Sequence, residues 1–368
     1  MAETQRRNLD PGASPELGGC CLDVGAFRLH FCIEFSPALH SRQMLHPLTF
    51  HPIFKDRVWG GRRLEQLYNK NLPTGLPIGE SWEVTDRPGD ISVIANGPLA
   101  GKDLHWLLEH HGAELLGAAK MQHGRFPLLT KILDAQEKLS IQVHPPTKQA
   151  AELGGEPKTE MWYIADAAPG AELFVGLRRG VTREEFGRKL AAGTVEECCH
   201  RIQVKSGDAM FLPSGRLHAI GAGLVIFEIQ QNSDTTYRVF DWNRLGLDGK
   251  PRTLHVKESL ASIDFNDFEP GLIRSDLKRT GPASICPLVS HPLFTVELYE
   301  AHAGAGVPLP PHKMQILAVI DGQLGVRDNC TTSSLDAGGF GLVPACLSQC
   351  EVRLETPARF LRIEAGQT

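Results

Sequence analysis

The chain has 368 residues, 42% of them hydrophobic, and a formal net charge of −5. This length and apolar content allow a sizeable core, divided over two folding units of ordinary size. The charge gives no electrostatic footprint for nucleic acid or an anionic membrane, and no stretch approaches the roughly 20 consecutive apolar residues that span a bilayer. The first residues also lack the apolar core of a secretion signal, so we expect a cytoplasmic protein with neither nucleic acid nor membrane as a partner.

Cysteine usage points to the same compartment. Nine cysteines are an odd number, and none of them lie in a CxxC pair. Both features argue against a disulfide framework and against a thiolate zinc site, and they favour reduced thiols. The cysteines are Cys20, Cys21, Cys32, Cys198, Cys199, Cys286, Cys330, Cys346 and Cys350.

Residues 1–44 differ from the rest of the chain. They show little periodicity and clustered Gly, Pro and Ser, and a second methionine, Met44, stands just before regular patterning begins. We interpret them as a poorly ordered N-terminal extension, or as residues ahead of a protein start at Met44.

Short strands separated by turn residues dominate the chain from Leu45 onward, with VWGG, GESWEV and ISVIANGP as early examples. Helical segments are insertions between these strands, and their starts are marked by an N-cap or a capping box: Asp103 for a helix over 103–120, Thr182 with Glu185, and Thr194 with Glu197. This pattern predicts a mainly β fold, an antiparallel barrel or double-sheet jelly roll with small helical insertions, rather than an alternating βαβ fold.

A faint internal repeat suggests two related barrels. Residues 207–213 (GDAMFLP) and 338–344 (GGFGLVP) each contain a glycine, five mostly apolar residues and a proline, and a further strand follows each. We therefore expect tandem jelly-roll barrels. The predicted units are 45–265 and a smaller C-terminal barrel at 266–368, in which the motif continues after Pro344 as ACLSQC, without a histidine.

The stretch LSIQVHPP, Leu139–Pro146, carries an unusual strand pattern. Alternation places Leu139, Ile141 and Val143 on one face, and Ser140, Gln142 and His144 on the other. A hydroxyl, an amide and an imidazole in a row do not suit a buried face. Because residues i and i+2 share a face, Gln142 and His144 are placed to supply two ligands to one metal ion.

Two further ligands are expected from the segments that follow. Glu160 opens the strand-like run EMWYIADA, and the short helical turn TKQAAELGG, closed by Gly154, is a connection short enough to bring the strands together. His218 follows the spacing G-x5-P-x-G-x2-H, in which Pro213 stops a strand and Gly215 permits a tight reversal. A lone histidine on a strand is usually a hydrogen-bonded core or surface residue, but the joint Gln/His/Glu/His pattern favours zinc or another divalent first-row ion.

These motifs and their flanks resemble one family in particular. The paired elements are similar to the two motifs of the cupin superfamily, and long strings resemble the short bacterial form of the type I mannose-6-phosphate isomerases, or phosphomannose isomerases. The resemblance covers most of the chain from Pro52 to about Phe265. It departs from the family at the extension before Met44 and at Pro146, where the family often has an acidic residue. The matching strings are PIFKDRVWGGRRL, IGESWEV, FPLLTKILDAQEKLSIQVHP, PKTEMWYI and LPSGRLHAIGAGLVIFEIQQNSDTTYRVFDWNR.

The resemblance implies a metal-dependent isomerase that interconverts mannose 6-phosphate and fructose 6-phosphate through an enediolate. It implies one Zn2+ per chain, held by His144, Glu160 and His218 with Gln142 as the fourth ligand. It also matches Arg238, Lys158 and Glu228 to residues that line the family's active site. We expect a small sugar phosphate as the partner, and a monomer or a homodimer.

Roles within such a site can be narrowed by chemistry. Arg238 is a fixed cation that suits a phosphate or the developing enediolate charge but not the base, and alternation puts Thr236 and Phe240 on its strand face. The base must be tunable toward neutral pH, which leaves Glu228, Lys158 or a histidine. Lys158 and Arg238 are also candidate substrate-binding residues. Ser140 is a third, since it can donate to sugar or phosphate, although it can equally satisfy a backbone group.

Two tryptophans are candidate contacts for a sugar. Trp59 and Trp82 suit either a stacking wall for a sugar or the core.

A non-catalytic cupin that binds a sugar phosphate as a sensor is the alternative function. An iron-dependent oxygenase is disfavoured, because only two histidines are in the set and Gln142 fills the position that oxygen would need.

Overall fold

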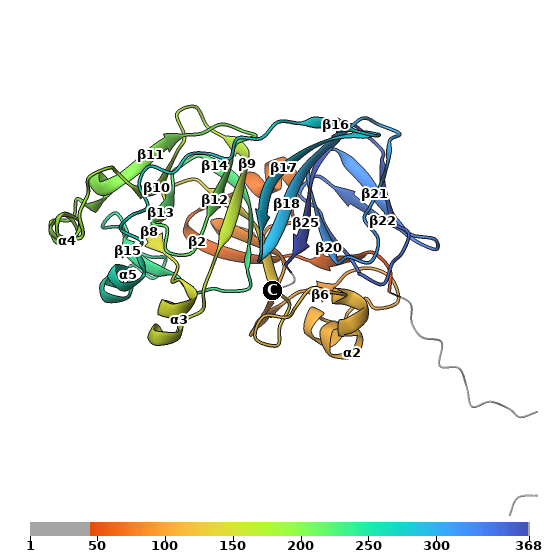
Figure 1. The fold of residues 1–368 in the computed structure, drawn as a ribbon, viewed down its shortest axis with the longest axis horizontal. Coiled ribbons are helices and arrows are strands. Elements are labelled where there is room, and N and C mark those ends of the chain that lie inside the picture. The colour runs from red at the N-terminus through yellow and green to blue at the C-terminus, as the bar shows by residue number, and fades with distance from the viewer. Residues whose placement is uncertain (1–44, 367–368) are drawn as a thin grey trace, which may run out of the picture. The chain divides into compact units, whose positions relative to one another are not determined.

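Four large β-sheets and the helices packed on them form the described part of the chain, residues 45–366, in a computed structural model (Figure 1). The predicted extension at 1–44 and Cys20, Cys21 and Cys32 lie outside the described residues. Paired strands throughout are antiparallel, and the mainly β class expected from the sequence is confirmed. None of the helices described is long and apolar enough to cross a membrane.

The two sheets that carry the site are built from strands between residues 53 and 240. The six-stranded sheet has the order β12 (Ala209–Leu212), β9 (Glu160–Ala167), β14 (Leu224–Gln231), β7 (Leu128–Ala135), β3 (Ile78–Val84) and β2 (Ile53–Gly61). The five-stranded sheet has the order β11 (Cys199–Gln203), β10 (Glu172–Leu177), β13 (His218–Ile220), β8 (Ile141–Val143) and β15 (Tyr237–Phe240). Side chains from both sheets, including Trp162 and Val175, meet in one buried apolar cluster.

The other two sheets contain the C-terminal strands. The eight-stranded sheet has the order β16 (Lys278–Thr280), β17 (Ala283–His291), β18 (Phe294–Ala301), β25 (Ala358–Ala365), β20 (Gln315–Asp321), β23 (Phe340–Val343), β1 (Leu48–His51) and β6 (Val93–Ile94). The four-stranded sheet has the order β19 (Gly306–Pro308), β24 (Glu351–Leu354), β21 (Gln323–Arg327) and β22 (Thr332–Asp336). The short strands β4 (Asp86–Arg87) and β5 (Asp90–Ile91) pair only with each other.

The first described strand crosses to the C-terminal sheet. β1 pairs with β23, with Leu48 opposite Leu342, and its other edge pairs with β6. Strands from the two ends of the described chain are therefore hydrogen-bonded neighbours.

Helix starts follow the sequence signals more closely than helix ends do. The Asp103 side chain accepts from the Trp106 N–H at 2.7 Å and caps α2 (Leu104–Leu116). The Thr182 side chain caps α4 (Arg183–Ala191) in the same way, so both caps are confirmed. The helix predicted to reach residue 120 ends at Leu116, because Gly117 adopts a positive φ of 58°. The other α-helices are α1 (Arg63–Tyr68), α3 (Thr147–Leu153) and α5 (Val256–Ser262).

The capping box predicted at Thr194 is wrong. The residues after it form a single 3-10 turn, Val195–Cys198, before β11 begins at Cys199. The Glu197 N–H bonds to the backbone carbonyl of Thr194, and the Thr194 side chain makes no cap. Four residues are too few for the α-helical turn that a capping box requires.

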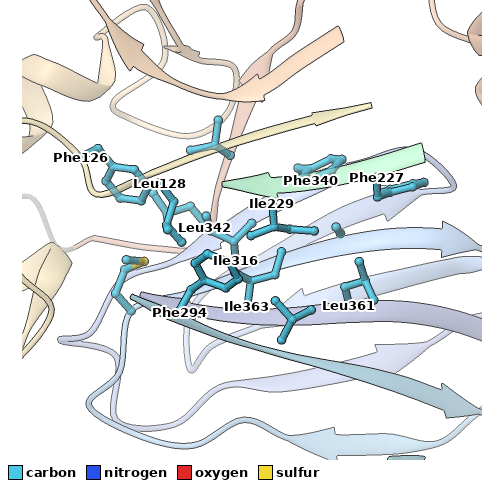
Figure 2. Close-up of a cluster of buried hydrophobic side chains, with 14 of the residues drawn as sticks. Phe126, Leu128, Phe227, Ile229, Phe294, Ile316, Phe340, Leu342, Leu361 and Ile363 are labelled. Atoms are coloured by element: carbon cyan, nitrogen blue, oxygen red, sulfur yellow. The ribbon is translucent and has the colours of Figure 1, made fainter. Parts of the chain in front are cut away.

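The largest apolar cluster lies between the six-stranded and the eight-stranded sheet (Figure 2). Phe227 of β14 is fully buried there, stacked on Phe340 of β23 with ring centroids 5.7 Å apart and in edge contact with Tyr68. Figure 2 shows Ile229, Ile316, Leu342 and Ile363 around this contact. The pair joins a strand of the six-stranded sheet to a strand of the eight-stranded sheet across one continuous core.

We predict that Phe227→Ala destabilises the protein by about 3–5 kcal/mol, since it leaves a cavity at a site closed in by two sheets. The measurement is denaturant-induced unfolding, followed by far-UV circular dichroism and by tryptophan fluorescence. Leu277→Ala, at a side chain that is 43% exposed, is the control and should shift stability by less than about 0.5 kcal/mol. Equal effects of the two substitutions would contradict this account of the core.

Candidate functional site

Three strand ends bring His144, Glu160 and His218 together. His144 follows β8 directly, while Glu160 and His218 are the first residues of β9 and β13. The Nε2 atom of His144 lies 3.6 Å from Glu160 Oε2, and that of His218 lies 3.5 Å from Glu160 Oε1. All three side chains are buried, and one donor atom from each falls within 4.8 Å of the others. Within residues 45–366 this is the one such group able to hold a metal ion.

Local turn chemistry produces this meeting point. Pro213 ends β12, and Gly215, with φ at 93°, reverses the chain so that His218 opens β13 opposite Gln142. The helical turn predicted before Glu160 is present as α3, and Gly154 closes it with φ at 69°. Both features are as expected from the sequence.

The imidazole orientations are fixed from behind. The Nδ1 atom of His144 lies 2.8 Å from the Thr235 carbonyl, and that of His218 lies 2.9 Å from the Arg216 carbonyl. A carbonyl only accepts, so each Nδ1 carries the proton and each Nε2 presents a lone pair toward Glu160. This back-bonding is the arrangement that orients histidine ligands in metal sites.

The central carboxylate is paired with one cation and faces two imidazole nitrogens. Lys158 Nζ lies 2.7 Å from Glu160 Oε2 and stabilises the negative charge of the carboxylate. Among the described residues, Glu160 Oε1 and Nε2 of His144 are buried without a hydrogen-bond partner. Two lone pairs facing a buried carboxylate repel it, and a divalent cation between them would satisfy all three groups. The residues therefore fit a metal ion.

Burial also sets the protonation of these groups. It lowers the pKa of His144 well below the usual range, and it lowers the pKa of His218 to about 4. Both rings are therefore neutral at physiological pH, as metal coordination would require. Burial raises the pKa of Glu160, against the opposing effect of Lys158. A bound cation would favour the charged carboxylate that ligation needs.

The polar face predicted for Ser140 and Gln142 is present, on a strand shorter than expected. β8 spans only Ile141–Val143, and the Ser140 hydroxyl donates to Gln142 Oε1 at 3.2 Å. The Gln142 amide nitrogen lies 3.3 Å from His218 Nε2. Rotating the amide by a half-turn about its last bond would place the oxygen there instead. Gln142 is thus close enough to join the ligand set.

A cavity of about 600 Å³ opens beside this group. It lies between the six-stranded and the five-stranded sheet, and its wall includes the predicted residues Ser140, Gln142, Lys158, Glu228 and Arg238. The remaining lining residues are Asp56, Arg57, Val58, Trp59, Glu80, Lys131, Leu133, Leu139, Asp234, Thr236, Gly246, Leu247, Asp248 and Arg252.

Alternating charges run along the cavity wall toward the candidate metal ligand Glu160. Lys131 Nζ lies 3.7 Å from Glu80 Oε2 and 3.3 Å from Glu228 Oε1. Lys158 lies between Glu228, at 3.7 Å, and Glu160, at 2.7 Å. Arg57 extends the series, since its Nε donates to Glu80 Oε1 at 2.8 Å. Every buried charge in this charged row, which runs from Arg57 to Glu160, therefore has a neighbour of opposite charge.

The pKa values of the row follow from these pairs. Burial alone would raise the pKa of Glu80, but Lys131 and Arg57 lower it to about 2. Likewise Lys158 and Lys131 outweigh burial and lower the pKa of Glu228. Burial acts to lower the pKa of Lys158, yet Glu160 and Glu228 raise it above the usual range. At neutral pH, Glu228 is therefore a carboxylate and Lys158 an ammonium.

Sequence reasoning missed Arg57, Glu80 and Lys131. A signal existed for Lys131, which lies in the middle of β7 among residues that are all buried. A lysine at such a position needs a partner or a function. Nothing local pointed to its partner Glu80, which arrives through the antiparallel pairing of β3 with β7.

Arg238 enters the cavity from β15, opposite Gln142. Its Nη1 donates to the Thr253 carbonyl at 2.8 Å. Thr236 shares the cavity face, but the expectation for Phe240 is wrong. A register shift between Arg238 and Phe240 turns that ring into a buried apolar cluster.

The two tryptophans divide between wall and core. Trp59 is 3% exposed and lines the cavity. Trp82 is buried outside the lining set, donates to Glu80 Oε2 at 2.6 Å and lies with its ring centroid 4.9 Å from Lys131 Nζ. Trp82 therefore contacts Glu80 and Lys131 of the charged row and does not form part of the cavity wall.

Comparison with known proteins agrees with this geometry. A sequence profile of the family "Phosphomannose isomerase type I, catalytic domain" matches residues 48–177. The chain is 36% identical over 324 residues to the probable mannose-6-phosphate isomerase GmuF of Bacillus subtilis, covering 85% of this chain and all of that protein. The chain belongs to the type I phosphomannose isomerase family. The family predicted from the sequence strings is thus confirmed.

Other members of the type I phosphomannose isomerase family match over similar lengths. The mannose-6-phosphate isomerase of Streptococcus mutans is 40% identical over 262 residues, or 70% of this chain and 79% of that protein. The crystal structure of the mannose 6-phosphate isomerase from Bacillus subtilis superimposes with a TM-score of 0.79 at 32% identity, over 86% of this chain and 99% of that one. The likeness therefore extends beyond the catalytic profile into the C-terminal sheets.

We predict that the purified protein retains about one divalent ion per chain after dialysis. His144→Ala should lose the ion, because the ligands that remain are too few to complete its coordination. Elemental analysis of the dialysed proteins measures this. His302→Ala, at an exposed histidine of the C-terminal half, is the matched control and should keep the ion. Full metal content in His144→Ala would place the ion elsewhere.

Proposed function

We propose that this protein interconverts mannose 6-phosphate and fructose 6-phosphate with one divalent ion held by His144, Glu160, His218 and Gln142. Membership of the type I phosphomannose isomerase family supports the reaction. The observation that carries the site is the buried Glu160 carboxylate. It faces two imidazole lone pairs beside a cavity lined by alternating lysines and glutamates.

The donor set supports zinc as the resident ion. Two imidazoles, a carboxylate and an amide oxygen form a hard-to-borderline set that suits zinc and other first-row divalent ions. When bound, the ion supplies a Lewis acid that stabilises negative charge on the substrate oxygens at C1 and C2. A neutral Gln142 in place of a second carboxylate leaves more of the ion's charge available for this.

The proton transfer is assigned to Glu228. Isomerisation requires a base that takes the C2 proton and returns it to C1. Glu228 lines the cavity as a carboxylate, and the Trp162 Nε1–H holds it at 2.9 Å. Lys158 cannot accept a proton in its ammonium form, so its role is electrostatic, toward the oxygen on which charge develops. Lys131, on the other side of Glu228, holds the base in place.

Substrate binding falls to the cavity wall around the metal ligands. Arg238 offers a guanidinium that pairs with anionic oxygens, and Ser140 offers a hydroxyl beside Gln142. Lys158 contributes a third contact at the reacting end of the cavity. These groups converge from β8, β9 and β15, so substrate would bridge the two sheets.

The finer architecture is part of the same proposal. We take residues 45–265 as a metal-binding cupin unit and 266–368 as a smaller C-terminal barrel, arranged as tandem jelly rolls. The repeated motif supports this, since in each half a glycine with positive φ precedes a strand and a proline ends it, at β12 and at β23. The strands β1 and β6 would then be exchanged into the C-terminal unit.

We also propose that the enzyme works in the cytoplasm on a small-molecule substrate. The six cysteines within the described residues are free thiols, which fits a reducing compartment.

The direct test is turnover by the metal-loaded protein. We expect fructose 6-phosphate to form from mannose 6-phosphate, with deuterium entering the sugar when the reaction runs in heavy water, and a chelator to abolish both. Coupled spectrophotometry and proton NMR measure these outcomes. Binding of the sugar phosphate without turnover would instead support the non-catalytic sensor, and would refute the isomerase.

A second prediction concerns Glu228. Glu228→Gln keeps the shape of the side chain but removes its ability to accept a proton, and it should lower kcat by about 100-fold or more with metal content unchanged. Glu172→Gln, at a partly exposed glutamate outside the cavity, is the control and should leave kcat at the wild-type value. Wild-type kcat in Glu228→Gln would transfer the role of base to another residue.

A further inference from the structure

The loop at residues 241–255 forms one wall of the cavity and is held in a defined shape. Leu245 pairs with Pro251, and the Gly246 N–H donates to the Lys250 carbonyl at 2.8 Å, so the loop folds back on itself. The His255 N–H donates to the Arg238 carbonyl at 2.8 Å, which ties the far end to β15. Gly246, Leu247, Asp248 and Arg252 of this loop line the cavity.

A buried carboxylate at the base of the loop orients its arginines. Asp241 is 5% exposed, and its two oxygens accept from Arg252 Nε and Nη2 at 2.7 and 2.5 Å. Oδ1 also accepts from Arg244 Nη2 at 2.9 Å, while Arg244 Nη1 donates to the Lys138 carbonyl. Arg244 is thereby directed away from the cavity lining, whereas Arg252 is part of it.

Arg252 therefore has one edge engaged and one edge available. Its Nε and Nη2 are spent on Asp241, and no residue of the range 45–366 forms a hydrogen bond with its Nη1. A guanidinium carries five N–H donors in a fixed plane, so the edge opposite Asp241 can still donate. The carboxylate fixes the plane of Arg252 in advance of any ligand.

Arg238 beside it is an arginine without a carboxylate. In the described chain it forms no ion pair, and its buried Nε has no hydrogen-bond partner. Arg57, on the other side of the cavity, is paired with Glu80. Burial lowers the pKa of Arg238, and the next largest effect comes from the charge of Arg252, with Asp241 acting in the opposite direction.

The charges at this end of the cavity do not balance. Three guanidinium groups, Arg238, Arg244 and Arg252, surround the buried carboxylate of Asp241, and of the three only Arg244 has a second carboxylate, Glu137 at 3.8 Å. The rim carboxylates Asp56 and Asp234 act on Arg57, and Asp248 accepts from the Lys250 N–H within its own loop. Cations crowded together at the wall of a cavity, one of them unpaired, are stabilised by an anionic ligand.

We propose that Arg252, held by Asp241, and Arg238 form a two-arginine clamp for the phosphate group of the substrate. The inference rests on the proposed function and deepens it, because it assigns the part of the cavity that distinguishes a sugar phosphate from a free sugar. Arg238 lies opposite Gln142 in the β15–β8 pairing, so the clamp and the metal ligands face the same cavity. The phosphate at one end of the sugar would thus be held while its other end meets Glu228 and Lys158.

The test compares Arg252→Ala with the wild type in the metal-loaded full chain. Loss of a charge-assisted bidentate contact should raise KM for mannose 6-phosphate, and the inhibition constant of inorganic phosphate, by about tenfold or more each. The turnover number should change by less than about threefold, and unphosphorylated mannose should be bound as in the wild type. Arg252→Lys should recover part of the affinity, because it keeps the charge but not the fork.

Lys250→Ala is the matched control. It removes the same charge from the same loop at an exposed side chain outside the cavity lining, and it should leave both constants at wild-type values. A collapse of the loop in Arg252→Ala would weaken mannose and phosphate alike, so the ratio of the two affinities separates a phosphate contact from a structural effect. Unchanged constants for inorganic phosphate and mannose 6-phosphate in Arg252→Ala would overturn the clamp while leaving the isomerase intact.

Direct titration with inorganic phosphate by isothermal calorimetry keeps the two proposals apart. If the wild type binds phosphate, and Arg252→Ala does not, the clamp stands even when no isomerase turnover is found. If the wild type isomerises mannose 6-phosphate but binds phosphate no more tightly than Arg252→Ala, the clamp is refuted.

Discussion

The buried carboxylate of Glu160 is the constraint on which the rest of the site depends. Its two oxygens lie about 3.5 Å from imidazole nitrogens that can only accept, and Lys158 pairs with Oε2 but reaches neither imidazole lone pair. Such an arrangement is costly in a low-dielectric interior unless a cation joins the groups. Carbonyls behind His144 and His218 hold the lone pairs in this position, so the fold itself maintains a place for positive charge.

The neighbouring residues extend that charge pattern along the cavity. Lys158 and Lys131 alternate with Glu228 and Glu80, and each group is held by a partner on an adjacent strand. Because Glu80, Lys131 and Glu228 lie on hydrogen-bonded strands of one sheet and Lys158 is paired with Glu228, these charges are oriented before substrate arrives. Preorganisation of this kind lowers the cost of developing negative charge on a substrate, since nothing has to rearrange during the reaction. Sheet architecture and catalysis are thus joined in the same residues.

Local signals in the sequence predicted those parts of the site that local geometry determines. Period-two alternation placed Gln142 beside His144, and proline and glycine chemistry around Gly215 aimed His218 at them. The charged row could not be found this way, because Arg57, Glu80 and Lys131 meet only through the pairing of β2, β3 and β7.

Predictions from local sequence patterns were wrong where the tertiary structure overrode them. Alternation failed at Phe240 because a register shift interrupts β15, and the capping box at Thr194 failed because β11 begins too soon. The shortened helix α2 shows the same effect at Gly117. Mainly β architecture, by contrast, follows from the frequency of turns along the whole chain, and it does not depend on any one residue.

The exchange of β1 into the C-terminal sheet affects how the protein is made. β1 is among the first described residues to leave the ribosome, yet its partner strand β23 is synthesised nearly 300 residues later. Until then, β1 and β6 have an open edge, and the apolar face shared by Phe227 and Phe340 is incomplete. The part of the chain that carries the candidate site therefore reaches its native core only when translation is almost finished. A nascent chain stalled before residue 340 would expose that face to chaperones or to other copies of itself.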